Sequence, residues 1–116
     1  MQPHIINGIG HFDVSGPDAG ALHGFYAAVF GWTALPKGPG YALLQTPDDS
    51  PNGAIVEAEA PAITIGVVVP DLDASLAAAL ASGGSVAMPV TDNGWVRKAV
   101  VADPAGNRIT LIAAGA

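Results

Sequence analysis

The sequence predicts an α+β fold in which two tandem βαβββ modules form curved sheets around a concave cavity, with the helices on the outer face. Strand-like and helix-like segments occur in the same order twice along the chain. Identical residues also recur 53 positions apart, which indicates a duplication. Neither half is long enough to bury its own sheet, so we expect one domain over 1–116, with modules at about 6–59 and 60–113. The recurring residues are Val14, Pro17, Asp18 and Gly31, which match Val67, Pro70, Asp71 and Gly84.

The first module begins with a strand at Ile9–Val14, where apolar residues alternate with small or polar ones. Asp18 is a typical N-cap residue for the helix that follows, and Gly31 is a typical residue just past its C-terminus. Three further strands are expected at 32–35, 41–46 and 54–58, separated by segments rich in Gly, Pro and Asp. The helix has apolar residues at spacings of three and four, namely Leu22, Phe25, Tyr26, Val29 and Phe30.

The second module repeats this order. An apolar, β-branched strand at 63–69 precedes Asp71, which caps a second helix that ends at Gly83 and Gly84. Strands at 85–90 and 95–102 are joined by a hairpin turn at 91–94, which contains Asn-Gly. A tight turn at 103–107 leads to the last strand at 108–113. The apolar positions of the second helix are Leu72, Leu76, Ala79 and Leu80.

Composition excludes several classes of partner. Half of the 116 residues are hydrophobic and 12% are charged, which is typical of a compact globular chain. The net charge of −6, with four Lys and Arg in all, argues against binding to nucleic acid or anionic membranes. No apolar run approaches 18 residues, and no Cys is present for disulfides or thiolate chemistry. Because the N-terminus also lacks a secretory signal, we expect a cytoplasmic protein.

Three motifs together resemble the vicinal oxygen chelate superfamily, which contains glyoxalase I, bleomycin-resistance proteins and extradiol dioxygenases. The motifs are Gly10-His11-Phe12, the run from Phe25 to Trp32, and the turn Asp103-Pro104-Ala105-Gly106-Asn107. The resemblance extends over residues 6 to 113 and implies the fold, whereas the activity differs among members of the superfamily. It also implies a homodimer.

The resemblance further implies where a divalent metal would lie. Enzymes of this superfamily take metal ligands from the first and last strand of each module. His11 matches the first of these positions, but Thr64 and Thr110 replace the His or Gln and the Glu expected in the second module. At an offset of 53 residues the partner of Thr110 is Glu57. Since zinc, nickel and iron sites normally have at least three protein donors, His11 and Glu57 alone predict an incomplete metal site and no cofactor.

Two classes of function follow from these residues. The first is a metal-independent protein of the bleomycin-resistance type, which binds a small, mainly apolar or aromatic molecule in its cavity. The alternative is a divalent-metal lyase or isomerase resembling glyoxalase I, in which His11 and Glu57 are residual ligands and the missing donors come from substrate or a second subunit. The sequence does not decide whether the protein is an enzyme.

The candidate catalytic residues are His11 and Glu57. Asp13 shares a face of its strand with His11 and would orient the imidazole, although we favour a role as a cap of the following turn. Glu57 either lies in the cavity as a general base or points to solvent. Arg97 and Arg108 bind an anionic ligand or, as we favour, form surface ion pairs. The predicted ligand pocket comprises His11, Glu57, Thr64, Thr110, Trp95 and Arg97.

Overall fold

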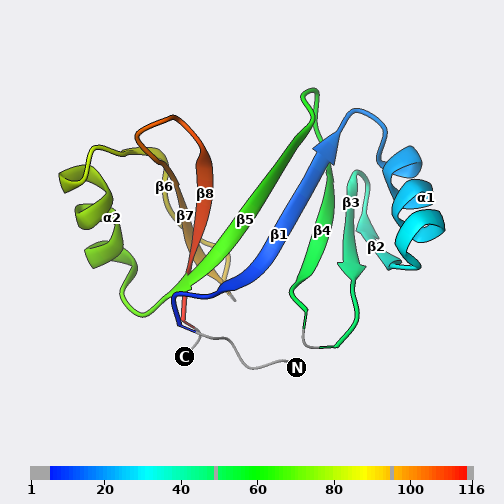
Figure 1. The fold of residues 1–116 in the computed structure, drawn as a ribbon, viewed down its shortest axis with the longest axis horizontal. Coiled ribbons are helices and arrows are strands. Elements are labelled where there is room, and N and C mark those ends of the chain that lie inside the picture. The colour runs from blue at the N-terminus through cyan, green and yellow to red at the C-terminus, as the bar shows by residue number, and fades with distance from the viewer. Residues whose placement is uncertain (1–5, 49, 95, 115–116) are drawn as a thin grey trace. The chain divides into compact units, whose positions relative to one another are not determined.

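The structure is a computed structural model that describes residues 6–48, 50–94 and 96–114. Contacts between residues divide the chain into two compact units, one covering His11–Thr64 and the other Ile65 onward together with the segment that ends at Gly10. The predicted order of elements occurs twice, once in each module (Figure 1). The α+β class and the paired βαβββ modules are therefore confirmed.

The strands and helices lie close to the predicted positions. The largest difference is at the second strand of module one, which ends three residues later than expected, inside a segment predicted as a turn. The last strand of module one begins two residues earlier than expected, inside a segment predicted as a loop. Module one contains β1 (Ile9–Gly16), α1 (Ala19–Phe30), β2 (Thr33–Gly38), β3 (Tyr41–Gln45) and β4 (Asn52–Glu57). Module two contains β5 (Ala62–Val69), α2 (Leu72–Ala81), β6 (Ser85–Asp92), β7 (Arg97–Ala102) and β8 (Arg108–Ala113).

Both modules have the same sheet topology. The strands of module one are ordered β2-β3-β4-β1, and those of module two are ordered β6-β7-β8-β5. In each case the first and last strands of the module are parallel neighbours, while the remaining pairs are antiparallel. The first strand of each module thus lies beside the last, which is where the superfamily resemblance places functional residues.

Helix α1 begins and ends as its capping residues predict. The Asp18 carboxylate accepts a hydrogen bond from the Ala21 N–H at 3.0 Å, which satisfies one amide of the first turn. Gly31 adopts φ 73°, a left-handed conformation that costs Gly little. The helix packs through Leu22 and Tyr26 onto a buried cluster of Ala34, Leu44 and Ile55.

The apolar stripe of α1 is only partly buried. Leu22 and Tyr26 contact the sheet, but Phe25, Val29 and Phe30 are 55%, 54% and 55% exposed. Tyr26 stacks on Trp32 with ring centroids 5.6 Å apart, so the aromatic residues also contact one another at the helix C-terminus. The sequence pattern therefore located the helix correctly but overestimated the width of its buried face.

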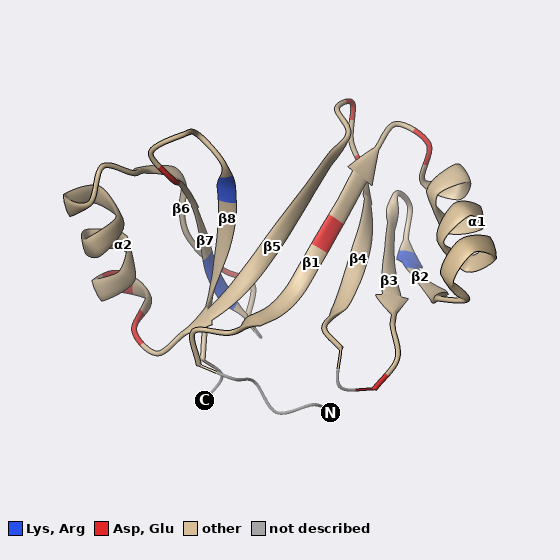
Figure 2. Cartoon of the chain, in the orientation of Figure 1, with Lys and Arg blue, Asp and Glu red and all other residues tan. Residues whose placement is uncertain are grey.

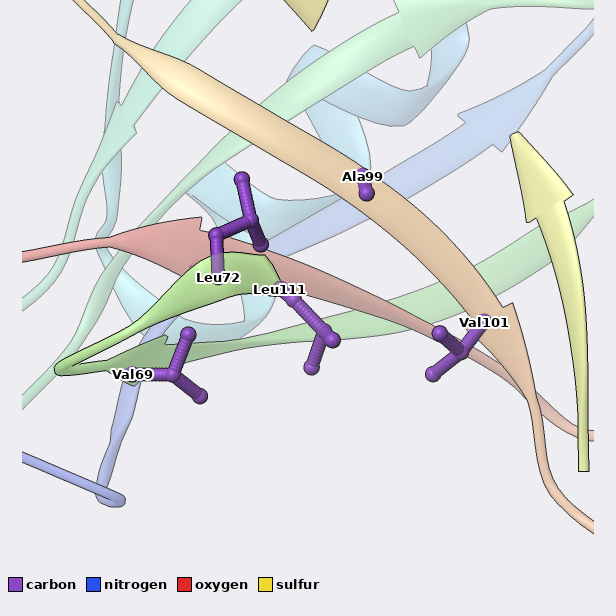
Figure 3. Close-up of a cluster of buried hydrophobic side chains, with 5 residues drawn as sticks. All are labelled: Val69, Leu72, Ala99, Val101 and Leu111. Carbon is purple, nitrogen blue, oxygen red and sulfur yellow. The ribbon is translucent and has the colours of Figure 1, made fainter. Parts of the chain in front are cut away.

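Module two has its own core beneath α2. Asp71 caps this helix by accepting a hydrogen bond from the Ala74 N–H at 3.0 Å. Leu76 and Ala79 pack from the helix against the buried cluster. The cluster takes one residue from α2 and the rest from β5, β7 and β8, as Figure 3 shows: Val69, Leu72, Ala99, Val101 and Leu111.

The register of the strands corrects the predicted repeat. In module one Asp13 is level with Ala54, and in module two Gly66 is level with Thr110. Asp13 and Gly66 are 53 residues apart, but Ala54 and Thr110 are 56 apart. The β6–β7 hairpin is longer than the β2–β3 hairpin, and the connection to β8 is only slightly shorter than the one to β4. The offset of 53 therefore holds for the first strand and the helix, and is wrong for the last strand.

Acidic residues lie mainly outside the strands, whereas the Lys and Arg residues lie on β2, β7 and β8. Figure 2 shows acidic positions mainly in turns and at the starts of helices, with one acidic residue, Asp13, within β1. Among the described residues no helix has the length and apolarity needed to cross a membrane.

Candidate functional site

Alternation along β1 separates two faces of the sheet in module one. Phe12 packs against the cluster beneath α1, so His11 and Asp13, which alternate with it, lie on the opposite side. We call that side the helix-free face of module one. The residues that define it come from β1, β3 and β4: His11, Asp13, Ser15, Tyr41, Leu43, Ala54 and Val56.

His11 and Asp13 form a hydrogen-bonded pair on this face. His11 Nε2 lies 3.0 Å from Asp13 Oδ1, and the two side chains are 29% and 32% exposed. Since a carboxylate can only accept, Nε2 carries a proton and donates a hydrogen bond to Asp13. In the neutral imidazole Nδ1 is then left as an acceptor. Asp13 therefore orients His11, and the favoured prediction that Asp13 caps the following turn is wrong.

Apolar side chains lie next to this pair. Ala54 on β4 is level with both Asp13 on β1 and Leu43 on β3. One alternate position along, Val56 is level with both Ser15 and Tyr41. The face thus combines a polar pair on β1 with an apolar patch on β3 and β4. Such a combination is typical of small-molecule sites, in which a few polar groups orient a mainly apolar ligand.

Tyr41 belongs to this face, although the sequence did not single it out. Burial raises the pKa of its phenol, and the negative charge of Asp13 raises that pKa further. Both effects keep the hydroxyl protonated, so Tyr41 is a hydrogen-bond donor at neutral pH. Alternation placed Tyr41 and Leu43 on one side of their strand, but only the register with β4 and β1 brings that side to Asp13.

Glu57 does not join His11. It is level with Gly16, whereas His11 is level with Asn52, five residues earlier on β4. Because five is odd, Glu57 lies on the opposite face, the same one as buried Ile55 beneath α1. It is exposed there. The prediction that Glu57 shares the cavity with His11 followed from an offset that does not hold at β4, and the structure corrects it.

Thr64 and Thr110 lie in module two, on the side of the sheet away from α2. Thr110 is level with Gly66 on β5, and Thr64 precedes Gly66 by one alternate position. Thr110 is 9% exposed and is the buried polar residue of the described chain. The counterpart of Thr110 in module one is Ala54 rather than Glu57. Ala54 is level with Asp13 on β1, and Thr110 is level with Gly66, the equivalent position on β5.

Arg97 and Arg108 lie at opposite ends of the β7–β8 pair, since Arg97 begins β7 and Arg108 is level with Ala102 at the end of that strand. Arg97 alternates with Ala99, so it lies on the side of β7 that carries α2. Its Nε is 3.9 Å from Asp92 Oδ2, which agrees with the favoured surface ion pair. Arg108 is exposed on β8. Trp95 lies outside the described residues.

The donor set of module one does not fit a zinc, nickel or iron(II) centre. With Glu57 on the other face, His11 and Asp13 are the strong donors that the described residues place on the helix-free face, and they already bond to each other. Asn52, level with His11, accepts a hydrogen bond from the Thr46 N–H at 3.0 Å. Within residues 6–48, 50–94 and 96–114 no group of three or more His, Cys, Asp or Glu is arranged to hold a metal ion.

Comparison with solved structures shows the same fold in several proteins. The chain superposes on a Mn(II)-bound glyoxalase from Novosphingobium aromaticivorans with a TM-score of 0.74 and 20% identity, over 96% of this chain and 40% of that one. It superposes on methylmalonyl-CoA epimerase from Mycobacterium tuberculosis with a TM-score of 0.73 and 16% identity, over 100% and 93% of the two chains. A glyoxalase/bleomycin resistance protein/dioxygenase superfamily member from Vibrio splendidus 12B01 gives 0.68 and 14%, over 88% and 95%.

No curated protein matches the sequence. The chain spans less than half of the glyoxalase and nearly all of the epimerase, so the likeness concerns the paired modules themselves. A family model for a glyoxalase-like domain matches residues 11–112, from the histidine of the polar pair to the end of β8. The chain therefore belongs to the family of glyoxalase-like domains.

Proposed function

We propose that the protein binds a small, mainly apolar or aromatic molecule on the helix-free face of module one, without a complete metal site. The observation that carries this proposal is the His11–Asp13 hydrogen bond, which lies beside the apolar residues Leu43, Ala54 and Val56. Asp13 fixes the orientation of His11, so that Nδ1 accepts a hydrogen bond from the ligand. Half-buried Leu43 and Val56 supply apolar contact area, whereas Ala54 is fully buried.

The proposal is tested with a set of small uncharged probes: acetophenone, cyclohexanone, phenol and indole. Each is titrated at millimolar concentration into ¹⁵N-labelled protein, because molecules of this size bind weakly. We expect at least one probe to shift the amide resonances of Asp13, Ala54 and Val56. Shifts confined to α1, where Phe25 and Phe30 are exposed, or no shifts at all would contradict the proposal.

A pair of variants locates the site more sharply. His11→Ala removes the acceptor and should weaken binding of phenol or indole, whose O–H or N–H can donate to Nδ1, about fivefold, the effect of losing one hydrogen bond. Glu57→Gln alters an exposed residue on the opposite face and should leave binding unchanged. If both variants weaken binding equally, the ligand does not lie on the helix-free face.

A divalent-metal lyase or isomerase is the second candidate. One structural neighbour is a Mn(II)-bound glyoxalase, and His11 opens the region that the glyoxalase-like family model matches. In this alternative His11 holds the metal, and the further donors come from substrate or a second subunit because Glu57 lies on the other face. About one metal per chain in untagged protein, lost together with ligand binding in His11→Ala, would favour this candidate over the first.

A further inference from the structure

Tyr41 has an unused hydrogen-bond donor on the helix-free face of module one. The other side-chain donors among the residues that define this face are engaged within the protein. His11 donates to Asp13, and Ser15 Oγ donates to the Ala60 carbonyl oxygen at 3.1 Å. The Tyr41 hydroxyl has no hydrogen-bond partner among the described residues, and Tyr41 is 41% exposed. It is therefore free to bind a molecule from solution.

The strand register brings Tyr41 towards Asp13. Tyr41 and Ser15 are both level with Val56, which lies between them. Neighbouring strands are about 4.8 Å apart, so the Cα atoms of Tyr41 and Ser15 are about 10 Å apart. Asp13 precedes Ser15 by two positions and therefore lies on the same side of β1. The register therefore places Tyr41 and Asp13 on the same side of the sheet, and the negative charge of Asp13 raises the pKa of the Tyr41 phenol.

We propose that Tyr41 donates a hydrogen bond to the bound molecule, and that Asp13 makes this face select uncharged molecules over carboxylates. This inference rests on the function proposed above and adds to it the class of ligand. A carbonyl oxygen, as in a ketone or an amide, accepts from Tyr41 without carrying a charge.

Electrostatics explain the selectivity. A ligand carboxylate that accepts from Tyr41 brings a second negative charge close to Asp13. His11 shares a hydrogen bond with Asp13, and the negative charge of Asp13 still acts on the Tyr41 phenol. Two negative charges about 10 Å apart on a half-buried surface repel strongly enough to change the affinity of the ligand about tenfold. An amide of the same size and shape meets no such repulsion.

Benzamide and benzoate are the matched probes, since they share a ring and differ in charge. Their affinities are measured from the shifts of the Ala54 and Val56 amide resonances in ¹⁵N-labelled protein. We expect benzamide to bind at least about tenfold more tightly than benzoate. Tyr41→Phe should weaken benzamide about fivefold, because it removes one hydrogen bond. Asp13→Asn should reduce the preference for benzamide to less than about threefold, mainly by strengthening benzoate.

Two control variants carry the same chemical changes on the other side of the sheet. Tyr26→Phe removes a hydroxyl from α1, and Glu57→Gln removes a negative charge from the helix-bearing face. Neither should change the affinity of either probe.

Equal affinities for the two probes, or an unchanged preference in Asp13→Asn, would overturn the inference and leave the proposed function intact. The inference is also wrong if neither probe shifts these resonances while acetophenone or another uncharged probe does. If no probe of either set shifts them, both the inference and the proposed function are wrong.

Discussion

His11 and Asp13 act together because they occupy alternate positions of one strand. The 3.0 Å hydrogen bond to a carboxylate assigns a proton to Nε2 and, in the neutral imidazole, leaves Nδ1 as an acceptor. Without Asp13 the imidazole would be free to adopt either tautomer and to rotate. The carboxylate thus has two effects on the same face, since it orients His11 and places a negative charge near Tyr41.

The stability of the fold should depend on the ionisation of Tyr41. Its pKa is raised above the usual 10.0 by burial and then by Asp13, so the unfolded chain loses the phenolic proton at lower pH than the folded one. The folded state therefore binds more protons above pH 10.0, and the free energy of unfolding falls as pH rises through that range. Urea unfolding between pH 8 and 11 should show a shallower alkaline fall in Tyr41→Phe than in the wild type.

Asp13→Asn distinguishes the two causes. Because burial is the larger cause, this variant should reduce the alkaline fall without abolishing it. A fall of equal steepness in the wild type and in Tyr41→Phe would show that Tyr41 does not titrate differently in the folded state.

Asp103 should make the free energy of unfolding fall at acid pH, whereas Tyr41 makes it fall at alkaline pH. The Asn107 side chain, 2.9 Å from Oδ2, holds the pKa of Asp103 below its usual 3.8, and the backbone amides of Asn107 and Ala105 lower it further. A lowered pKa stabilises the fold at any pH above the pKa of Asp103 in the unfolded chain. This stabilisation is lost as the pH falls through the pKa of Asp103 in the folded protein. Asp103→Asn should therefore be less stable than the wild type at pH 7, with the difference shrinking below pH 3.8.

Asn107→Ala removes the largest cause and should lose part of the same pH dependence. Urea unfolding at pH 7 and at a pH below 3.8 gives the free energy of unfolding of Asp103→Asn, Asn107→Ala and the wild type. A stability difference that stays constant from pH 7 into the acid range would contradict the role given to the Asp103 carboxylate.

Close packing between β1 and β4 fixes the helix-bearing face of module one. A Cβ at Gly53 would lie 2.6 Å from the Phe12 ring and 2.7 Å from the Phe12 carbonyl oxygen, and the backbone atom cannot move aside easily. Gly53→Ala should therefore destabilise the protein by about 1–3 kcal/mol. Because Phe12 alternates with His11 and Asp13, the same change should also disturb the polar pair.

Gly24→Ala is the matched control for this substitution. Gly24 lies within α1, and a Cβ there meets nothing within 4 Å. Replacing it should stabilise the helix by about 0.5–1 kcal/mol. Thermal or urea unfolding of both variants tests the comparison, and two alanine variants of equal stability would contradict the packing described for Gly53.

The sequence predicted elements better than the relations between them. Capping by Asp18 and Asp71 and the left-handed Gly31 were predictable, because these depend on a few neighbouring residues. The partner of Thr110 was not, because it depends on the lengths of two hairpins and on where each ladder begins. The predicted offset of 53 differs from the observed 56 by three residues. Because side chains alternate between the two faces of a strand, an odd error placed Glu57 on the wrong face as well as at the wrong level.

At the scale of the whole molecule, the duplication predicted the architecture because each module repeats the same local rules. Both modules have the same strand order and a helix over their own buried cluster. The site was less predictable, since His11 and Asp13 are close in sequence but Tyr41 reaches them only through two strand pairings. A homodimer and a cytoplasmic location stay predictions that rest on the resemblance and the composition.

Removal of metal tests the central claim most directly. Untagged protein is titrated with acetophenone, or with whichever uncharged probe binds most tightly, before and after treatment with a chelator. We predict the same affinity in both titrations and far less than one divalent metal per chain. A full equivalent of zinc, nickel or manganese that survives dialysis, with binding lost on chelation and restored by the metal, would contradict the account.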